Sequence, residues 1–140
     1  LIPYNHNIHT DFAVEIAPIL AEYFGCKLKF IMVFEPNLSN EDRTKHETEL
    51  KELIAGRGFE AEIKLIHNED ILNSVVKESQ TADLILMGGR SGDMFELLLG
   101  RSLTQEITEQ SACPVIWVKE YEEREPFWKL LMKPIKAPGE

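Results

Sequence analysis

The sequence predicts an α/β fold: a single doubly wound domain built on a five-stranded, mainly parallel sheet. Three observations favour it. Segments that alternate like strands take turns with segments that have the three-to-four-residue apolar spacing of helices. The connections between them are short and rich in turn-forming residues. Residues 30–34 are apolar on both faces, which is typical of a central strand covered by helices on both sides.

The first half of the chain should contain five elements. In the order strand, helix, strand, helix, strand they are residues 1–3, 11–24, 27–34, 41–55 and 60–66. The first helix has a buried face that runs from Phe12 to Phe24 and includes Ile19, it contains Pro18, and it should end at Gly25. Asn40 is the expected N-cap of the second helix.

The second half should add four elements. They are a helix, a strand, a helix and a strand at residues 70–79, 84–87, 102–110 and 114–118. The first of these helices should turn four apolar residues inward: Ile71, Leu72, Val75 and Val76. Right-handed crossovers place the carboxyl ends of all parallel strands at one edge of the sheet. The loops 4–7, 35–38 and 88–92 should therefore meet there, where ligands of such folds bind.

A glycine-rich segment follows the strand at 84–87. Gly88, Gly89 and Gly92 come first, and Gly100 precedes the helix that opens at Ser102. Glycines let backbone amides approach a ligand, and a helix start presents unpaired N–H groups at a positive dipole end. This segment therefore predicts a phosphate-binding edge, although tight turns alone would also explain the glycines.

Composition and charge narrow the function classes. The chain has 140 residues, a size typical of one globular domain. A net charge of −9 argues against nucleic acid as a partner. The two cysteines favour a reducing, cytoplasmic compartment over a disulfide framework. No run approaches the roughly 20 apolar residues of a membrane helix, and we expect no signal peptide.

Catalytic and metal-binding motifs are not recognisable. The sequence Gly89-Arg90-Ser91-Gly92 lacks the spacing of a hydrolase nucleophile elbow, and there is no phosphate-binding lysine loop. His6 and His9 have no further cysteine or histidine nearby, so we expect no metal cluster. The chain is therefore predicted not to be an enzyme.

Four features together resemble the universal stress protein family, whose fold is adenine nucleotide α hydrolase-like. They are Leu1-Ile2-Pro3, an alanine-containing first helix, the run from Asp83 to Gly88, and Leu98-Leu99-Gly100 followed by a helix and the run from Cys113 to Val118. The resemblance covers residues 1–119 and leaves 120–140 as a C-terminal extension.

The resemblance implies that ATP or AMP binds between the glycine motif and the end of the first strand. The implied nucleotide-binding residues are Pro3, Tyr4, Asn5, Val33, Met87, Gly88, Gly89, Arg90, Gly92, Gly100, Arg101 and Ser102. Three features differ from the family's nucleotide-binding members. Arg101 follows Gly100 where those members carry serine or threonine, so Ser102 is displaced by one residue. Asn5 stands where those members carry aspartate, and Gly92 and Gly100 are separated by seven residues instead of nine.

Arg90 and Arg101 have two explanations. They could form an anion clamp, because arginine makes strong charge-assisted contacts with phosphate, or they could be solvated loop residues. Ser102 could contact phosphate, or it could form a capping box with Gln105.

The resemblance also implies a homodimer through the last strand, with Val115, Ile116, Trp117 and Val118 at the interface. The extension 120–140 joins an acidic run to an apolar, lysine-containing run that could pack on this domain, a partner or a membrane surface. Two functions follow. One is a regulatory, stress-response module that binds an adenine nucleotide. The other is a nucleotide-free cytosolic regulatory or dimerisation domain of an amino-acid or cation transporter, which would belong to the same polypeptide.

Overall fold

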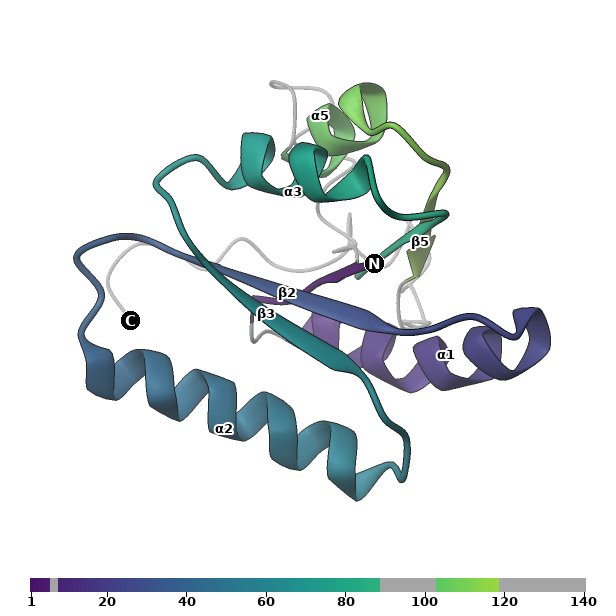
Figure 1. Cartoon of the computed structure of the whole chain (residues 1–140), viewed down its shortest axis with the longest axis horizontal. Coiled ribbons are helices and arrows are strands. Elements are labelled where there is room, and N and C mark those ends of the chain that lie inside the picture. Colours follow the sequence, from purple (N-terminus) through teal and green to yellow (C-terminus); the bar gives the residue numbers. More distant parts are fainter. Residues whose placement is uncertain (6–7, 89–102, 119–140) are drawn as a thin grey trace, which may run out of the picture.

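The computed structural model describes residues 1–5, 8–88 and 103–118, and Figure 1 shows how they are arranged. The described elements are β1 (Ile2–Pro3), α1 (Ile8–Phe24), β2 (Lys29–Phe34), α2 (Asn40–Gly56), β3 (Glu62–His67), α3 (Ile71–Ser79), β4 (Ile85–Gly88), α5 (Leu103–Gln110) and β5 (Val115–Val118). This alternation of strands and helices confirms the predicted α/β class.

All strand pairs of the described residues are parallel. The strands β1, β2 and β3 form one hydrogen-bonded ladder, in which Ile2 lies opposite Phe30 and Phe30 opposite Ile63. The strands β4 and β5 form a second ladder, in which Leu86 lies opposite Ile116. Five strands were predicted in one sheet, and the structure arranges five strands as these two ladders.

Two backbone hydrogen bonds join the ladders. The amide of Leu86 donates to the carbonyl of Leu1 at 2.9 Å, and the nitrogen of Leu1 donates to the carbonyl of Leu84 at 2.8 Å. This is the bonding pattern of a parallel pair centred on Leu1 and Ile85. The resulting strand order is β3-β2-β1-β4-β5, so the order reverses between β1 and β4.

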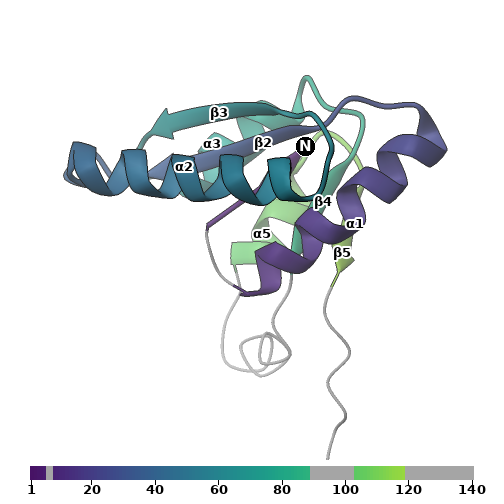
Figure 2. The ribbon, with the colours of Figure 1, turned by 90° about the horizontal axis from the view of Figure 1, so that it is seen from below.

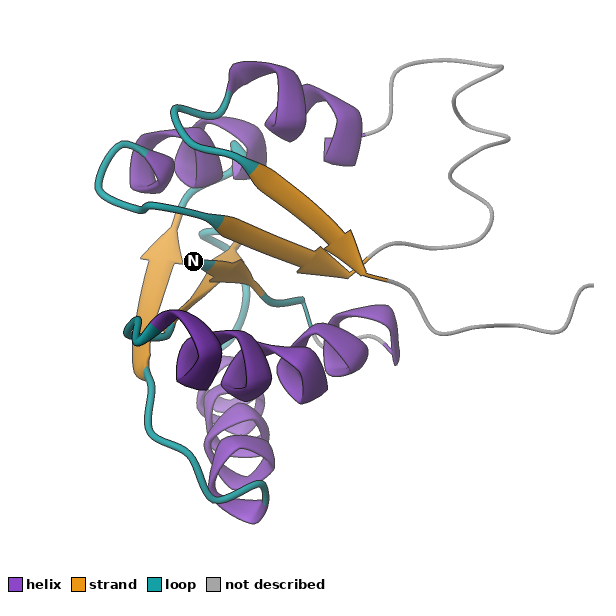
Figure 3. Ribbon diagram, turned by 90° about the vertical axis from the view of Figure 1, so that its right-hand side faces the viewer, coloured by secondary structure: helices purple, strands orange, loops and turns teal. Residues whose placement is uncertain are grey.

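Helices cover both faces of the sheet, with α1 and α2 on one side and α3 and α5 on the other (Figure 3). The alternation of β2 explains this arrangement. Phe30, Met32 and Phe34 belong to the core cluster under α1 and α2, whereas Ile31 belongs to the cluster with Val75 of α3. Figure 2 shows α1 on the side of β4 and β5, which it contacts.

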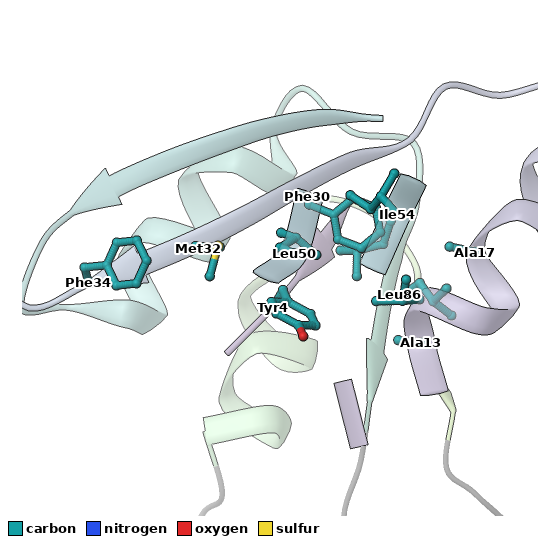
Figure 4. Packing of buried hydrophobic residues seen from close by; sticks show 11 residues of the cluster. Tyr4, Ala13, Ala17, Phe30, Met32, Phe34, Leu50, Ile54 and Leu86 are labelled. Atoms are coloured by element: carbon teal, nitrogen blue, oxygen red, sulfur yellow. The ribbon is translucent and has the colours of Figure 1, made fainter. Parts of the chain in front are cut away.

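The first helix approaches the sheet through small side chains. Ala13, Val14 and Ala17 are completely buried, and Figure 4 shows the two alanines facing Leu86 of β4. Ile19 and Phe24 were predicted to lie on the buried face, but 62% of each is exposed. That prediction was wrong because the contact face is narrow, and Ile19 lies outside the three-to-four spacing that joins Ala13 to Ala17.

Local signals end the helices close to the predicted positions. Gly25 follows α1 with φ +64°, a left-handed conformation that favours glycine, as the stop signal predicted. The N-cap of α2 is Ser39 and not Asn40, because the Ser39 hydroxyl accepts a hydrogen bond from the Asp42 amide at 3.1 Å. In α3 the N-cap is Asp70, and Ile71 is exposed at the first helical position instead of pointing inward as predicted.

Candidate functional site

The candidate site lies where the strand order reverses, at the carboxyl ends of β1 and β4. The chain leaves β1 after Pro3 and continues through Tyr4 and Asn5, and β4 ends beside these residues at Gly88. Open parallel sheets bind ligands at such reversal points because the two adjoining loops diverge to opposite faces. The structure thus brings the predicted residues Pro3, Tyr4, Asn5 and Gly88 to one edge.

Tyr4 anchors the start of the loop after β1. Its ring lies in the core, with 4% of the residue exposed, and its amide donates to the Ile31 carbonyl at 2.9 Å. Its hydroxyl donates to Asp11 Oδ1 in α1 at 2.8 Å. Burial and the hydrogen bond to the Asp11 carboxylate both raise the pKa of Tyr4. The phenol therefore stays protonated and ties β1 to the first turn of α1.

Asn5 has the opposite character. It is the next residue along the chain, and its side chain is exposed at the edge of the sheet. An amide both donates and accepts hydrogen bonds, so it can meet a ribose hydroxyl or the edge of a base without carrying charge. The change from buried Tyr4 to exposed Asn5 is what presents a polar group at this edge.

Two further predicted residues, Met87 and Val33, provide apolar surface next to the edge. Met87 is buried on the side of α3 and α5, in the cluster that also holds Ile31. Val33 is half-buried and lies opposite Ile66 of β3. These side chains can supply apolar surface but no polar contact.

The remaining predicted residues are Gly89, Arg90, Gly92, Gly100, Arg101 and Ser102, and they lie outside the described residues. The phosphate-binding loop, the arginine clamp and the capping box therefore stay predictions. The described part of the chain resumes at Leu103, where α5 begins.

A further cluster at this edge was not predicted from the sequence. The ring of Phe34, at the end of β2, stacks against His46 of α2 with centroids 6.1 Å apart and against His67 of β3 at 6.4 Å. His46 Nδ1 also lies 3.5 Å from Glu49 Oε2, one helical turn away. The sequence does not show which face of α2 packs on β2, so it could not place His46 next to Phe34.

Comparison with known proteins identifies the architecture. No protein-family model matches the sequence, and no curated protein is significantly similar to it. A universal stress protein in complex with cAMP superposes with a TM-score of 0.69 and 20% identity, over 84% of this chain and 93% of that one. A universal stress protein from Archaeoglobus fulgidus gives 0.67 and 17%, over 83% of this chain and 89% of that one. The same family's Archaeoglobus fulgidus complex with dAMP gives 0.61 and 17%, over 83% and 93%.

The chain has the universal stress protein fold. This confirms the predicted adenine nucleotide α hydrolase-like architecture.

In this universal stress protein fold, β5 is the terminal strand of the described sheet, bonded only to β4. Val115 and Val118 are half-buried, whereas Ile116 is 38% and Trp117 43% exposed. The indole of Trp117 donates to Thr108 Oγ1 of α5 at 3.0 Å, which holds the ring along that helix. The strand thus offers both apolar side chains and an open backbone edge.

The universal stress protein fold of this chain also has a large open groove at the opposite, amino-terminal edge of the sheet. It measures about 1780 Å³ and includes neither Asn5 nor Gly88. The described residues contain no cluster of three or more His, Cys, Asp and Glu side chains placed to hold a metal ion. Within the same ranges, no helix is long and apolar enough to cross a bilayer.

Proposed function

We propose that this chain is a non-enzymatic regulatory module of the universal stress protein type that binds an adenine nucleotide, ATP or AMP. The observation that carries the proposal is the reversal of strand order between β1 and β4, which sets exposed Asn5 beside Gly88. This is the position at which nucleotides bind in open parallel sheets. The similar folds solved with cAMP and with dAMP support the same ligand class.

Each part of the site has a role in this proposal. Asn5 bonds the ribose or the adenine edge, and Val33 and Met87 provide apolar surface beneath it. The phosphates lie over the backbone amides of 88–92 and near Gly100 and Ser102. Arg90 and Arg101 neutralise the phosphate charge in the anion-clamp form of the site.

A regulatory role without catalysis fits the chemistry that the site offers. The described part of the edge presents an amide, apolar side chains, the two histidines stacked on Phe34 and a phenol that is already bonded to Asp11. Binding would change the surface around residues 88–102 instead of transforming the ligand. We place this module in the cytosol, which suits its free cysteines Cys26 and Cys113.

The experiment is thermal and urea unfolding of the 140-residue chain with ATP, AMP or cAMP. A ligand at a hundred times its Kd should add about 2.7 kcal/mol to the free energy of unfolding. Asn5→Ala should weaken binding about tenfold, the effect of losing one hydrogen bond. Gln80→Ala removes an exposed amide at the end of α3, before the amino end of β4 and thus away from the carboxyl edge that holds Asn5, and should bind as the wild type does. No stabilisation by any of the three nucleotides would refute the proposal and favour the nucleotide-free transporter domain.

We also propose that β5 pairs two copies into a homodimer. No described strand pairs with the outer edge of β5, and its Ile116 and Trp117 are exposed, which supports this because an apolar edge strand tends to pair. Sedimentation equilibrium should give twice the mass of the chain for the wild type and the single mass for Ile116→Lys. A wild type that sediments as a single chain at all concentrations would contradict the dimer.

A further inference from the structure

The groove at the amino-terminal edge of the sheet lies between α1, the second half of α2 and the strand ends. Apolar side chains from four elements or their loops line it, among them Leu20, Phe24, Ile54, Phe59, Ile63 and Ile116. Phe24 is mostly exposed in it, although an aromatic side chain gains most from burial. An open apolar groove of this size is typical of a surface that another segment covers.

The groove carries a surplus of negative charge. Five carboxylates and three lysines line it. Glu47 is paired with Lys51 at 2.6 Å, and Glu78 with Lys29 at 2.7 Å. Among the described residues, the other three carboxylates of the groove form no ion pair: Glu60, Glu62 and Asp83. Lys27 is the one remaining lysine of the lining. An occupant with apolar and cationic side chains would suit this lining.

We propose that residues 126–136 of the same chain occupy this groove. This segment contains Phe127, Trp128, Leu130, Leu131, Met132 and Ile135, together with the three lysines 129, 133 and 136. It has no acidic residue. Its composition thus complements both the apolar lining and the unpaired carboxylates. The acidic run 120–125 that precedes it would be repelled by the same lining.

The chain is long enough for this return. Ile116 of β5 already lines the groove, and β5 runs away from it for only two further residues to Val118. The connection 119–125 has seven residues, which can span up to about 24 Å when extended. The whole of β5 has four residues, so its length is about 13 Å. The connection can therefore turn at the carboxyl edge and come back along the sheet.

A natural cysteine makes the proposal testable in the full chain. Cys26 is exposed and lines the groove, whereas burial raises the pKa of the half-buried Cys113 and makes its thiol less reactive. In a Cys113→Ser background, Leu131→Cys places a thiol in the middle of the proposed occupant. Glu123→Cys is the matched control, because it is closer along the chain to β5 but belongs to the acidic run.

Mild oxidation followed by non-reducing electrophoresis and peptide mapping gives the readout. The Leu131→Cys chain should form the intramolecular disulfide with Cys26 at least about tenfold faster than the Glu123→Cys chain, since docking raises the effective concentration of the thiol. Equal rates in both chains would show tethering without docking and would overturn the proposal. Disulfides between chains would assign the groove to a second copy and would overturn it as well.

A second measurement uses the tail without an added thiol. In the Cys113→Ser background, the double substitution Leu130→Asp and Leu131→Asp should speed the reaction of Cys26 with a maleimide about tenfold, because the groove loses its cover. Circular dichroism would verify that the domain is folded in both chains. An unchanged rate would overturn the proposal, and it would leave the nucleotide site at the opposite edge unaffected.

Discussion

Replacing Tyr4 by phenylalanine isolates the bond that ties β1 to α1 beside the candidate site. The phenol donates to Asp11 Oδ1 at 2.8 Å, and the phenylalanine ring would fill the same buried space. A hydrogen bond to a charged group contributes about 1.5–3 kcal/mol, and Asp11 is only half-buried. At pH 7 we therefore expect Tyr4→Phe to lower the free energy of unfolding by about 1.5 kcal/mol.

The pH dependence gives a sharper expectation. Because the pKa of Tyr4 is raised in the folded chain, the folded state keeps the phenolic proton above pH 10 while the unfolded state releases it. The stabilisation is complete below the unfolded pKa of about 10 and is lost as the pH rises above it. Relative to the Tyr4→Phe variant, the wild type should lose about 1.4 kcal/mol between pH 9 and pH 11, so the two stabilities converge near pH 11.

Urea unfolding followed by circular dichroism at each pH measures both effects. Other groups that titrate in this range, such as lysines, are common to the two proteins and cancel in the difference. Tyr23→Phe serves as the control, because it removes an exposed hydroxyl and leaves the bond between Tyr4 and Asp11 intact. A constant difference between wild type and Tyr4→Phe from pH 7 to pH 11 would refute the linkage argument.

Three further substitutions test the packing and electrostatics of the fold. Glu78→Gln should cost about 1 kcal/mol at pH 7, because the carboxylate accepts hydrogen bonds from two lysines at 2.7 and 2.6 Å that lower its pKa. This cost should shrink as the pH falls below the ordinary glutamate pKa of about 4.3, and it should vanish below the lowered pKa that Glu78 has in the folded chain. Phe30→Ala should cost about 3–5 kcal/mol, since the side chain is fully buried and packs on Phe59, whereas Phe24→Ala should cost far less. Ser39→Ala removes the N-cap of α2 and should cost about 1 kcal/mol.

Chemical denaturation reports all three, and each has an outcome that counts against its reasoning. The ion-pair argument fails if Glu78→Gln destabilises equally at pH 7 and pH 3. A loss at Phe30 no greater than at Phe24 would contradict the placement of the core. For Ser39, stability equal to the wild type would mean that the cap does not hold α2 in solution.

Local signals predicted most of the elements. The apolar run of residues 30–34 indicated a strand covered on both faces, and β2 lies between β1 and β3 with helices on both sides. The buried residues of α2, Leu50 and Ile54, have the four-residue spacing of a helix face, which the sequence displays directly. Such signals act within a few residues of the chain, so the sequence displays them directly.

Contacts between distant segments were not visible in the sequence. Ser79 is buried, and its hydroxyl is fully hydrogen-bonded there. It donates to the Val76 carbonyl at 2.6 Å and accepts a hydrogen bond from the Ala112 amide, 33 residues away, at 2.9 Å. The stacking of Phe34 between two histidines likewise joins separate elements. A serine in a helix and a histidine on a charged helix both look like surface residues until the partner segment is known.

The candidate site could be predicted from the sequence only in part. Crossover handedness predicted that Asn5 and Gly88 meet at one edge, and the structure brings the ends of β1 and β4 together. Crossover handedness places strand ends and not side chains, so it did not predict that the ring of Tyr4 turns into the core. The glycines and arginines of 89–102 remain predictions.

The junction between the two ladders gives one amide unusual diagnostic value. In the described part of the chain, Leu86 is the sole residue of β4 whose N–H bonds to the neighbouring ladder, at Leu1 just before β1. Hydrogen exchange at this position therefore measures how often the halves of the sheet separate. A molecule that bridges both halves at their carboxyl ends would slow that exchange, even though it touches neither Leu86 nor Leu1.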